Sequence, residues 1–480
     1  MKKLEKITPW KQDFAKWYVD VITQAELMSY GPVKGTMYLK PNGYAIWSSI
    51  QNVLNFVFQE LSIKNVYFPS LIPQSFIEKE KQHVKGFSPE LLTITHVGEK
   101  KLPENIYLRP TSEVLFADFF KKEIAHKNRL PILLNQWCQV TRWEKTTNPF
   151  LRTTEFLWQE GHTVHEDSSK AKKFAKIMIE NYKFIVEKFL AIPVIVGKKT
   201  QKERFAGAKT TYTIEAMMKD GRALQAGTSH YLGQNFSKNF DITFKNKDNQ
   251  LEYVYQTSWG VSTRLIGALI MTHGDDRGII IPPSIAEYKV DILGFFVNKH
   301  PNLEKAILKL SDELDDFHIT NRVDLSDNQV GFKIANSEVL GTPVRIEIGP
   351  RDLEAKQVVV VRRDTLEKKI VPTSEIVNHL EQLFQEIQAN LFEQAKQRLT
   401  ENIVYVENYE NFKVAIAQSR FVVAAFSETQ KQEIKIQEET GATSRCIVSN
   451  KDFIIPLPAE AKSLFSGKKT NKFVVFAKSY

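Results

Sequence analysis

Residues 139–165 decide the fold of this chain; they read QVTRWEKTTNPFLRTTEFLWQEGHTVH. Two polar, aromatic-rich runs flank a short Asn-Pro turn, and this pattern is typical of a β-hairpin. Arg142 ends the first run and Arg152 begins the second. Because two guanidinium groups meet at the turn, we predict a hairpin that holds an anion.

Side-chain alternation assigns the faces of this hairpin. Successive side chains of a strand point to opposite faces, so Arg142 and Glu144 share one face of the first strand. By the same rule, Trp158, Glu160 and His162 share one face of the second. Tryptophan is out of place on a solvent-exposed face, and Glu and His are out of place in an apolar core. We therefore interpret this face as the floor of a binding site, the alternative being an exposed sheet with one stray aromatic.

Length and composition limit the class of protein. A chain of 480 residues holds about two to four domains, and 42% hydrophobic with 25% charged residues is ordinary for a globular protein. The sequence has neither the apolar stretch of a signal peptide nor a run approaching the ~20 apolar residues of a membrane span. We therefore expect a cytoplasmic protein with no membrane partner. The net charge of +9 favours a polyanionic partner such as nucleic acid.

Cysteine and glycine positions argue against two common kinds of site. Only Cys138 and Cys446 occur, which is too few for a disulfide framework or a four-cysteine zinc site. The string GKKT at 197–200 is similar to the end of a nucleotide-binding loop, but Ile192 stands where that loop needs its first glycine. We predict a surface turn there.

The sequence pattern divides the chain into three parts. Residues 1–286 mix helices and strands too closely for a bundle or a sandwich, and Pro282-Pro283 marks a break. Residues 287–372 contain a strand, a helix and short β-like runs, which predict a small α/β domain. Residues 373–480 begin with a long amphipathic helix, expected over about 373–400, and end in a small terminal domain.

A second tract, SWGVSTRLIGALIMTHGDDRGIIIPP at 258–283, passes from an extended run into an apolar helix. Arg264 stands at the junction. The first turn of a helix combines unpaired N–H groups with the positive end of the helix dipole, so phosphate would bind well there. Taken alone, an arginine at a helix start is more often a surface residue.

Several strings together, in content and in order, resemble the signature motifs of class II aminoacyl-tRNA synthetases, and in finer detail those of prolyl-tRNA synthetases. The strings are VYFP at 66–69, RPTSE at 109–113, RWE at 142–144, PFLRTTEFLWQEGHT at 149–163, QAGTSHYLGQNF at 225–236, GVSTR at 260–264 and RIEIGPRD at 345–352. The resemblance implies an α+β catalytic domain with an antiparallel class II sheet over residues 1–286. An α/β anticodon-binding domain over 287–372 and a linker helix with a small α+β C-terminal domain over 373–480 are implied as well.

The same resemblance implies the reaction. Proline and ATP would form prolyl-adenylate and pyrophosphate, with Mg²⁺ on the triphosphate, and the prolyl group would then pass to tRNA(Pro). Arg142 matches the residue on the α-phosphate and Arg264 the residue on the distal phosphates, and these two are the expected catalytic residues. An arginine fork suits a phosphate that becomes more negative in the transition state. The ATP contacts implied are Arg142, Glu144, Arg152, Thr153, Gln225, Thr228, Thr263 and Arg264, with Gln225 also a candidate for the magnesium ion.

The implied proline pocket uses different chemistry. The secondary ammonium of proline offers two donors, which Thr111 and Glu113 would meet from one strand-like face. Apolar side chains would cover the pyrrolidine ring, and Glu160 and His162 would hold the pocket together through hydrogen bonds. The residues implied are Thr111, Glu113, Arg142, Trp158, Glu160, His162, Phe205 and His230.

Partners follow from the same resemblance. Glu338 and Arg345 match positions suited to the two guanines of a proline anticodon, because Glu accepts from N1 and N2 and Arg donates to O6 and N7. Ser337 replaces a tryptophan found before that glutamate in many relatives, so base stacking there is in doubt. Residues 45–69 have the form of the first class II motif, which predicts a homodimer.

Two departures from the family narrow the expectation further. Only Cys446 remains of the four zinc cysteines that many C-terminal domains of the family contain, so we expect a metal-free version. About a hundred residues separate the second and third motifs, all needed for the catalytic sheet, so we expect no inserted editing domain.

Two other classes of function stay open at this point. A catalytically inactive paralogue that binds tRNA or a protein partner would keep the fold and lose the phosphate-binding arginines, yet Arg142, Arg152 and Arg264 are all present. A sister synthetase for threonine, serine or histidine would share the scaffold. A threonine enzyme needs a zinc held partly by cysteine, and Cys138 has no suitable partners on the hairpin.

Overall fold

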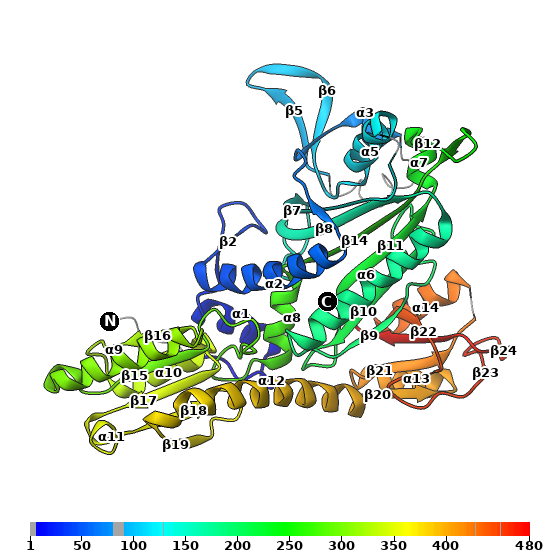
Figure 1. Ribbon diagram of the computed structural model, residues 1–480. Helices are drawn as coiled ribbons and strands as arrows, with labels where there is room; N and C mark the ends of the chain where they lie inside the picture. Colours follow the sequence, from blue (N-terminus) through cyan, green and yellow to red (C-terminus); the bar gives the residue numbers. More distant parts are fainter. Residues whose placement is uncertain (1–5, 80–90, 128, 428, 452) are drawn as a thin grey trace.

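The computed structural model describes residues 6–79, 91–127, 129–427, 429–451 and 453–480. One large central sheet runs through the molecule. A five-stranded sheet lies at one end of the molecule, and a three-stranded sheet lies above the central sheet (Figure 1). Among the described residues, none of the helices combines the length and apolar character needed to cross a membrane.

Seven strands make up the catalytic part of the central sheet. In spatial order they are β9 (Val194–Lys198), β10 (Thr210–Met217), β11 (Ala223–Gly233), β14 (Tyr255–Ser262), β8 (Glu155–His165), β7 (Ile132–Thr141) and β3 (Lys64–Asn65). Every neighbouring pair is antiparallel except β3 with β7. The antiparallel sheet that the sequence predicted is therefore confirmed.

Helix α6 (Ser168–Lys188) covers one face of this sheet. The side chain of Asp167 caps the helix by accepting from the backbone N–H of Lys170 at 2.8 Å. Apolar residues recur at helical spacing along its buried side. They are Ala171, Ala175, Met178, Ile179, Tyr182, Ile185 and Val186. Helices α1 (Phe14–Gln24), α2 (Pro41–Glu60) and α8 (Arg264–His273) contribute to the same core.

Gly161 on β8 shows how closely this core is packed. Trp259 of the neighbouring strand lies across the glycine, and a Cβ atom there would fall 2.1 Å from the indole ring. Trp259 itself is almost fully buried. A larger residue at position 161 would therefore displace the tryptophan that joins the sheet to its helices.

The hairpin forms as predicted, but its strands end earlier than expected. Because β7 stops at Thr141 and β8 begins at Glu155, Arg142 and Glu144 lie in the connecting loop, and the prediction that they occupy one face of a strand is wrong. Tertiary contacts hold this loop: the backbone N–H of Arg142 donates to Thr154 O at 2.8 Å, and that of Thr154 donates to Gly35 O at 2.8 Å. The sequence of the hairpin does not show that Gly35 is the hydrogen-bond acceptor for Thr154.

Smaller elements with an aromatic core of their own cover the upper end of the sheet. They are β4 (Leu71–Pro73), α3 (Gln74–Glu78), β5 (Thr93–Val97), β6 (Lys100–Leu108), α5 (Glu113–Lys127), α7 (Asn235–Phe240), β12 (Thr243–Lys245) and β13 (Leu251–Tyr253). The pair β1 (Met28–Tyr30) and β2 (Met37–Leu39) precedes α2.

A five-stranded mixed sheet forms the predicted α/β domain. Its order is β16 (Asn321–Asp324), β15 (Val290–Gly294), β17 (Val344–Ile348), β18 (Gln357–Arg362) and β19 (Lys368–Pro372). Its helices are α9 (Pro301–Asp316), α10 (Val330–Leu340) and α11 (Pro350–Glu354). The first three strands pair in parallel and the last two are antiparallel additions.

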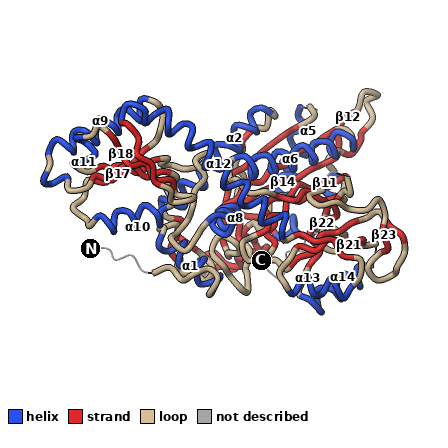
Figure 2. The backbone as a smooth tube through the Cα atoms, turned by 90° about the horizontal axis from the view of Figure 1, so that it is seen from below, coloured by secondary structure: helices blue, strands red, loops and turns tan. Residues whose placement is uncertain are grey.

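The C-terminal part extends the central sheet rather than standing apart from it. The long helix α12 (Ile376–Glu401) runs from the five-stranded sheet to the opposite end of the molecule, as Figures 1 and 2 both show. Strands β20 (Ile403–Val406), β21 (Phe421–Ala425), β25 (Phe473–Ala477) and β22 (Thr443–Val448) then continue the sheet, with Ile447 of β22 opposite Lys198 of β9. Helices α13 (Tyr409–Ala417) and α14 (Gln430–Thr440) and the short pair β23 (Ala461–Lys462) and β24 (Lys469–Thr470) complete this part.

The junction between β9 and β22 corrects the prediction for residues 197–200, which form no surface turn. Gly197 belongs to β9, and Lys199 and Thr200 are buried. A Cβ atom on Gly197 would lie 2.6 Å from that of Cys446, so the glycine lets the C-terminal strand approach. The covering strand comes from a distant part of the chain, and local sequence gave no sign of it.

Candidate active site

A cavity of about 240 Å³ lies on the face of the central sheet opposite α6. Along β10, Tyr212 and Ile214 point into the core shared with α6, whereas Thr211 points into the cavity. Strands β8, β11 and β14 supply most of the remaining lining, and α5 and α8 begin at its edges.

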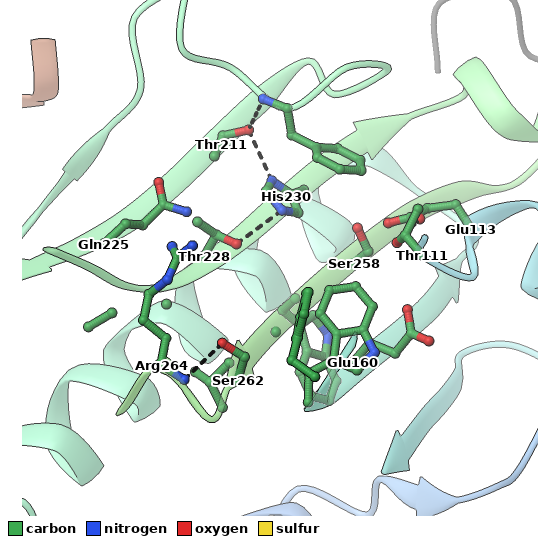
Figure 3. A pocket seen from close by; sticks show the side chains of 18 of the residues that line it. Thr111, Glu113, Glu160, Thr211, Gln225, Thr228, His230, Ser258, Ser262 and Arg264 are labelled. Atoms are coloured by element: carbon green, nitrogen blue, oxygen red, sulfur yellow. Dashed lines mark hydrogen bonds between the residues drawn. The ribbon is translucent and has the colours of Figure 1, made fainter. Parts of the chain in front are cut away.

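The cavity gathers most of the residues that the sequence predicted. Those that line it are Thr111, Glu113, Arg142, Trp158, Glu160, His162, Phe205, Gln225, Thr228, His230 and Arg264. Four predicted ATP contacts, Glu144, Arg152, Thr153 and Thr263, stand outside the lining. Figure 3 shows Thr111 and Glu113 at one side of the cavity and Gln225 and Arg264 at the other.

Thr111 and Glu113 meet at the start of a helix. The expectation of a strand-like face is wrong, because α5 begins at Glu113 and Thr111 precedes it in a loop. The hydroxyl of Thr111 donates to Glu113 Oε2 at 2.5 Å, and both side chains are buried. A buried carboxylate next to a hydroxyl is a strong acceptor site for a cationic donor.

The carboxylate of Glu160 is the centre of a buried hydrogen-bond network. It accepts from the backbone N–H and the hydroxyl of Ser112, and from Gln136 Nε2 at 2.5 Å. Its Oε2, which accepts from the Ser112 N–H, also lies 3.2 Å from His162 Nε2. The His162 ring in turn stacks on Phe116 with centroids 3.9 Å apart. This network fixes the β8 floor of the cavity to the start of α5.

His230 is held in one orientation and kept neutral. Its Nδ1 lies 3.0 Å from the hydroxyl of Thr211 and its Nε2 lies 3.2 Å from the hydroxyl of Thr228, as the dashed lines in Figure 3 show. Phe205 stacks on the ring with centroids 4.4 Å apart. Burial lowers the pKa of His230 to about 4, although the nearby Glu113 acts to raise it. The ring is therefore uncharged at neutral pH.

Cationic side chains lie together at the side of the cavity opposite Thr111 and Glu113. Arg142 Nε donates to Pro110 O at 3.0 Å, and its guanidinium lies over the Trp158 ring at 5.3 Å. Arg264 Nε donates to Leu151 O at 3.1 Å. Burial, followed by the charges of Arg142 and Arg152, lowers the pKa of Arg264 to about 10. The fold therefore holds these guanidinium groups together against their mutual repulsion, which an anion would relieve.

Two buried hydroxyls beside this cluster have no hydrogen-bond partner within the described part of the chain. They are Thr153 Oγ1 and Thr263 Oγ1. Buried polar groups are normally paired. Both residues were predicted as ATP contacts, and neither lines the cavity in this structure.

Some members of the site were missed at the level of sequence. Gln136 stands directly opposite Glu160 on the neighbouring strand, and Thr211 stands directly opposite His230. The positions that alternate with Gln136 are Ile132, Leu134, Cys138 and Val140, so no polar pattern selected it. Thr211 gave no signal either, because only the strand register selects it.

The two predicted anticodon residues also come together, in the five-stranded domain. Arg345 Nη1 lies 3.2 Å from Glu338 Oε1, and Arg345 Nε lies 2.9 Å from Glu347 Oε1. Glu338 and Arg345 are both buried. A residue that sequence reasoning missed, Arg277 after α8, donates to Glu338 Oε2 at 2.8 Å. The two residues are therefore engaged with protein partners in this structure.

Comparison with protein-family models gives three matches along the chain. Residues 96–273 match the class II core domain of tRNA synthetases for G, H, P, S and T, and residues 291–383 match the anticodon binding domain. Residues 409–480 match the C-terminal domain of prolyl-tRNA synthetase. The matches follow the same order as the three parts of the fold.

Curated relatives agree along their full length. The chain is 56% identical over 480 residues to a proline–tRNA ligase of Mesomycoplasma hyopneumoniae (strain 7448), covering 100% of both chains. It is 55% identical over 481 residues to that of Mycoplasma mobile, again covering 100% of both. Identity to the ligase of Oceanobacillus iheyensis is 47%, over 99% of this chain and 98% of the relative. With its signature residues gathered in one cavity and with relatives this similar from end to end, the chain belongs to the prolyl-tRNA synthetase family.

Proposed function

We propose that this protein joins L-proline to tRNA(Pro) in two ATP-dependent steps, through a prolyl-adenylate intermediate. The observation that supports this best is the cavity with a buried acceptor pair, Thr111 and Glu113, at one side and the guanidinium groups of Arg142 and Arg264 at the other. An amino acid that binds the first pair by its ammonium group presents its carboxylate toward the arginines. That is the orientation needed for attack on the α-phosphate.

The proline side of the cavity fits a small cyclic amine. Glu113 and Thr111 would accept the two N–H donors of the secondary ammonium group. Trp158 and Phe205 would cover the pyrrolidine ring, because they give the lining its apolar surface there. His230 would contact the substrate as an uncharged group, since a charged imidazolium would repel the ammonium. Glu160 and His162 would keep this wall in place through the network with Ser112 and Gln136.

The phosphate side fits ATP. Arg142 would grip the α-phosphate with two donors as its charge increases in the transition state, and Arg264 would bind the distal phosphates. Glu144, which lies 3.8 Å from Arg152, would accept from the adenine amino group. Thr153, Thr263, Gln225 and Thr228 would donate to the remaining oxygens. None of these groups needs to act as a nucleophile, so the rate would come from positioning and electrostatics.

Magnesium is the ion we expect to enter with ATP. Gln225 faces the cavity beside Arg264 and offers a neutral amide oxygen, which suits a hard cation already coordinated by phosphate oxygens. Within the described residues, no three His, Cys, Asp or Glu side chains gather into a metal site of the protein's own. The bound ion would neutralise part of the triphosphate charge.

The anticodon of the tRNA would bind in the five-stranded domain. Glu338 and Arg345 would read the two guanines of the anticodon by exchanging their present ion pairs for base edges.

Residues 166–254, between the hairpin and β14, are taken up by α6, α7 and strands β9–β13, which leaves no separate editing domain in that stretch. Alanine would be rejected by only ~1–3 kcal/mol, because the smaller side chain loses only apolar contact. We expect the protein to act in the cytoplasm, where tRNA is charged.

A homodimer would cover a group of exposed aromatic residues near the N-terminus. They lie on or beside β1, β2, α2 and β3, and are Tyr30, Tyr38, Tyr44, Phe56 and Tyr67. Large apolar side chains are often exposed at surfaces that bind another protein. Sedimentation at micromolar concentration would give twice the mass of the chain, and a species of single mass throughout would contradict the dimer.

Pyrophosphate exchange with proline, alanine and threonine tests the proposed reaction. Exchange with proline, weak exchange with alanine and none with threonine are expected from the native protein. Arg142→Ala would reduce proline-dependent exchange by about 10²–10³-fold, because a preorganised phosphate donor is lost. Arg129→Ala, which removes an exposed arginine outside the cavity lining, is the matched control. A folded native protein that binds tRNA without any exchange would instead be the inactive paralogue.

A further inference from the structure

A buried cluster of three charged side chains lies where the C-terminal strands join the central sheet. Glu215 of β10 is fully buried, and its Oε1 lies 2.7 Å from Lys199 Nζ. Its Oε2 accepts from Arg445 of β22 through Nε at 2.9 Å and Nη2 at 2.8 Å. Thr213 Oγ1 also donates to Oε1 at 2.8 Å. The carboxylate is thus enclosed by donors from three parts of the chain.

This cluster lies beside the phosphate side of the cavity, on the same face of the sheet. Thr211, Thr213 and Glu215 alternate along the same face of β10, and Thr211 lines the cavity. Glu215 stands opposite Gln225 in the β10–β11 register, and Gln225 lines the cavity beside Arg264. The electrostatic effects agree with this placement, since the charge of Arg445 acts to lower the pKa of Arg264 and that of Glu215 acts to raise it.

Arg445 is the main cationic partner of the Glu215 carboxylate. Burial acts to raise the pKa of Glu215, but Arg445 and then Lys199 hold it below its usual value, so the carboxylate stays ionised. Burial lowers the pKa of Lys199, although Glu215 acts to raise it. Arg445 binds the carboxylate through two nitrogens and is therefore the cation that offsets the negative charge opposite Gln225. A buried charge acts over longer distances than a surface charge, because water screens it less.

We propose that Arg445, supplied by the C-terminal domain, is a positioning residue for ATP that offsets the charge of Glu215 beside the triphosphate. The inference rests on the proposed function, because it assigns the cavity to ATP. Without Arg445 the cluster would be more negative by one charge, and Glu215 would compete with the triphosphate for the nearby Arg264. The C-terminal domain is thereby part of the ATP site, although none of its residues lines the cavity.

The experiment separates the charge of the cluster from its packing. Three variants of the full-length protein change the charge of the cluster: Arg445→Gln removes one cation, Glu215→Gln removes the carboxylate, and the double variant removes both. The readout is the KM for ATP and for proline in pyrophosphate exchange. KM does not depend on the fraction of protein that is folded, so partial loss of stability does not obscure the result.

If the proposal holds, the KM for ATP follows the net charge. Arg445→Gln raises it about fivefold, as expected for one poorly screened charge several ångströms away, while the KM for proline is unchanged. Glu215→Gln leaves the KM for ATP at or below the native value, and the double variant returns it to the native value. Arg445→Lys keeps the charge and rescues most of the effect.

Thr200→Val is the matched control. Thr200 is buried at the same junction, where it donates to Glu433 Oε1 at 2.6 Å, and it carries no charge. Its loss should leave both KM values unchanged. An unchanged KM for ATP in Arg445→Gln, or an equal rise in both single variants, would overturn the role of Arg445. Absence of exchange in the native protein would overturn the proposed function instead.

Discussion

The catalytic cavity and the anticodon pair both bury charged side chains, but they do so in opposite ways. Around the cavity, Arg264 is held near Arg142 and Arg152, and its pKa is lowered by burial and by their charges. In the five-stranded domain, Glu338 and Arg345 are paired with each other, and Arg277 adds a further cation to Glu338. The first region is arranged for a charge that the ligand brings, whereas the second is electrostatically complete without one. The difference predicts that the two regions respond differently to mutation.

The largest expected effect is on activity at the cavity. Arg264→Met would reduce proline-dependent exchange by about 10²–10³-fold, because one of the two phosphate-binding arginines is lost. The melting temperature should stay the same or rise, since the mutation removes a buried cation from a group of like charges. Scanning calorimetry beside the exchange assay measures both. A clear fall in melting temperature would show that Arg264 stabilises the fold, and the contrast between the two regions would then be lost.

A smaller effect is expected at the anticodon pair, and there it includes stability. Arg345→Ala would leave Glu338 and Glu347 with fewer donors, so the free energy of unfolding should fall. Aminoacylation would lose about 10–100-fold in kcat/KM for tRNA(Pro), the cost of one bidentate base contact. Pyrophosphate exchange without tRNA is the internal control and should be unchanged. Loss of exchange to the same degree would mean that the variant is simply unfolded.

The smallest effect is expected at Arg277, where the segment after α8 contacts the five-stranded domain. Arg277 is more than half exposed, so its ion pair with Glu338 should contribute less than about 1 kcal/mol. Arg277→Ala would free one oxygen of Glu338 and should change kcat/KM for tRNA(Pro) by less than about fivefold. The buried ion pair between Arg363 and Asp275, at 2.7 Å, would still join the domains. A loss as large as that of Arg345→Ala would place Arg277 in the anticodon site itself.

The sequence predicted the residues that line the cavity better than the residues that hold them in place. Arg142, Trp158 and His230 were found because they belong to strings that resemble a family, and all of them line one cavity. The roles assigned to them remain predictions. Gln136 and Thr211 were missed because only cross-strand register brings them to Glu160 and His230.

The errors concern segments whose structure depends on distant parts of the chain. Residues 197–200 read as a surface turn, but β22 buries them from more than two hundred residues away. Glu144 was assigned to a strand, but contacts with Gly35 and within the hairpin loop end that strand early. The alternation of side chains within one strand does not show that β22 covers residues 197–200 or that Gly35 contacts the hairpin loop.

By itself the sequence determined the family through its signature strings, and the antiparallel sheet and the order of the three parts followed from that resemblance. Only the tertiary structure decided that the C-terminal strands continue the catalytic sheet and bring Arg445 to Glu215. It likewise decided that Glu338 and Arg345 are paired rather than open. Both outcomes depend on contacts between residues that are far apart in the sequence. Such contacts, and the burial of the charges involved, arise only when the chain folds.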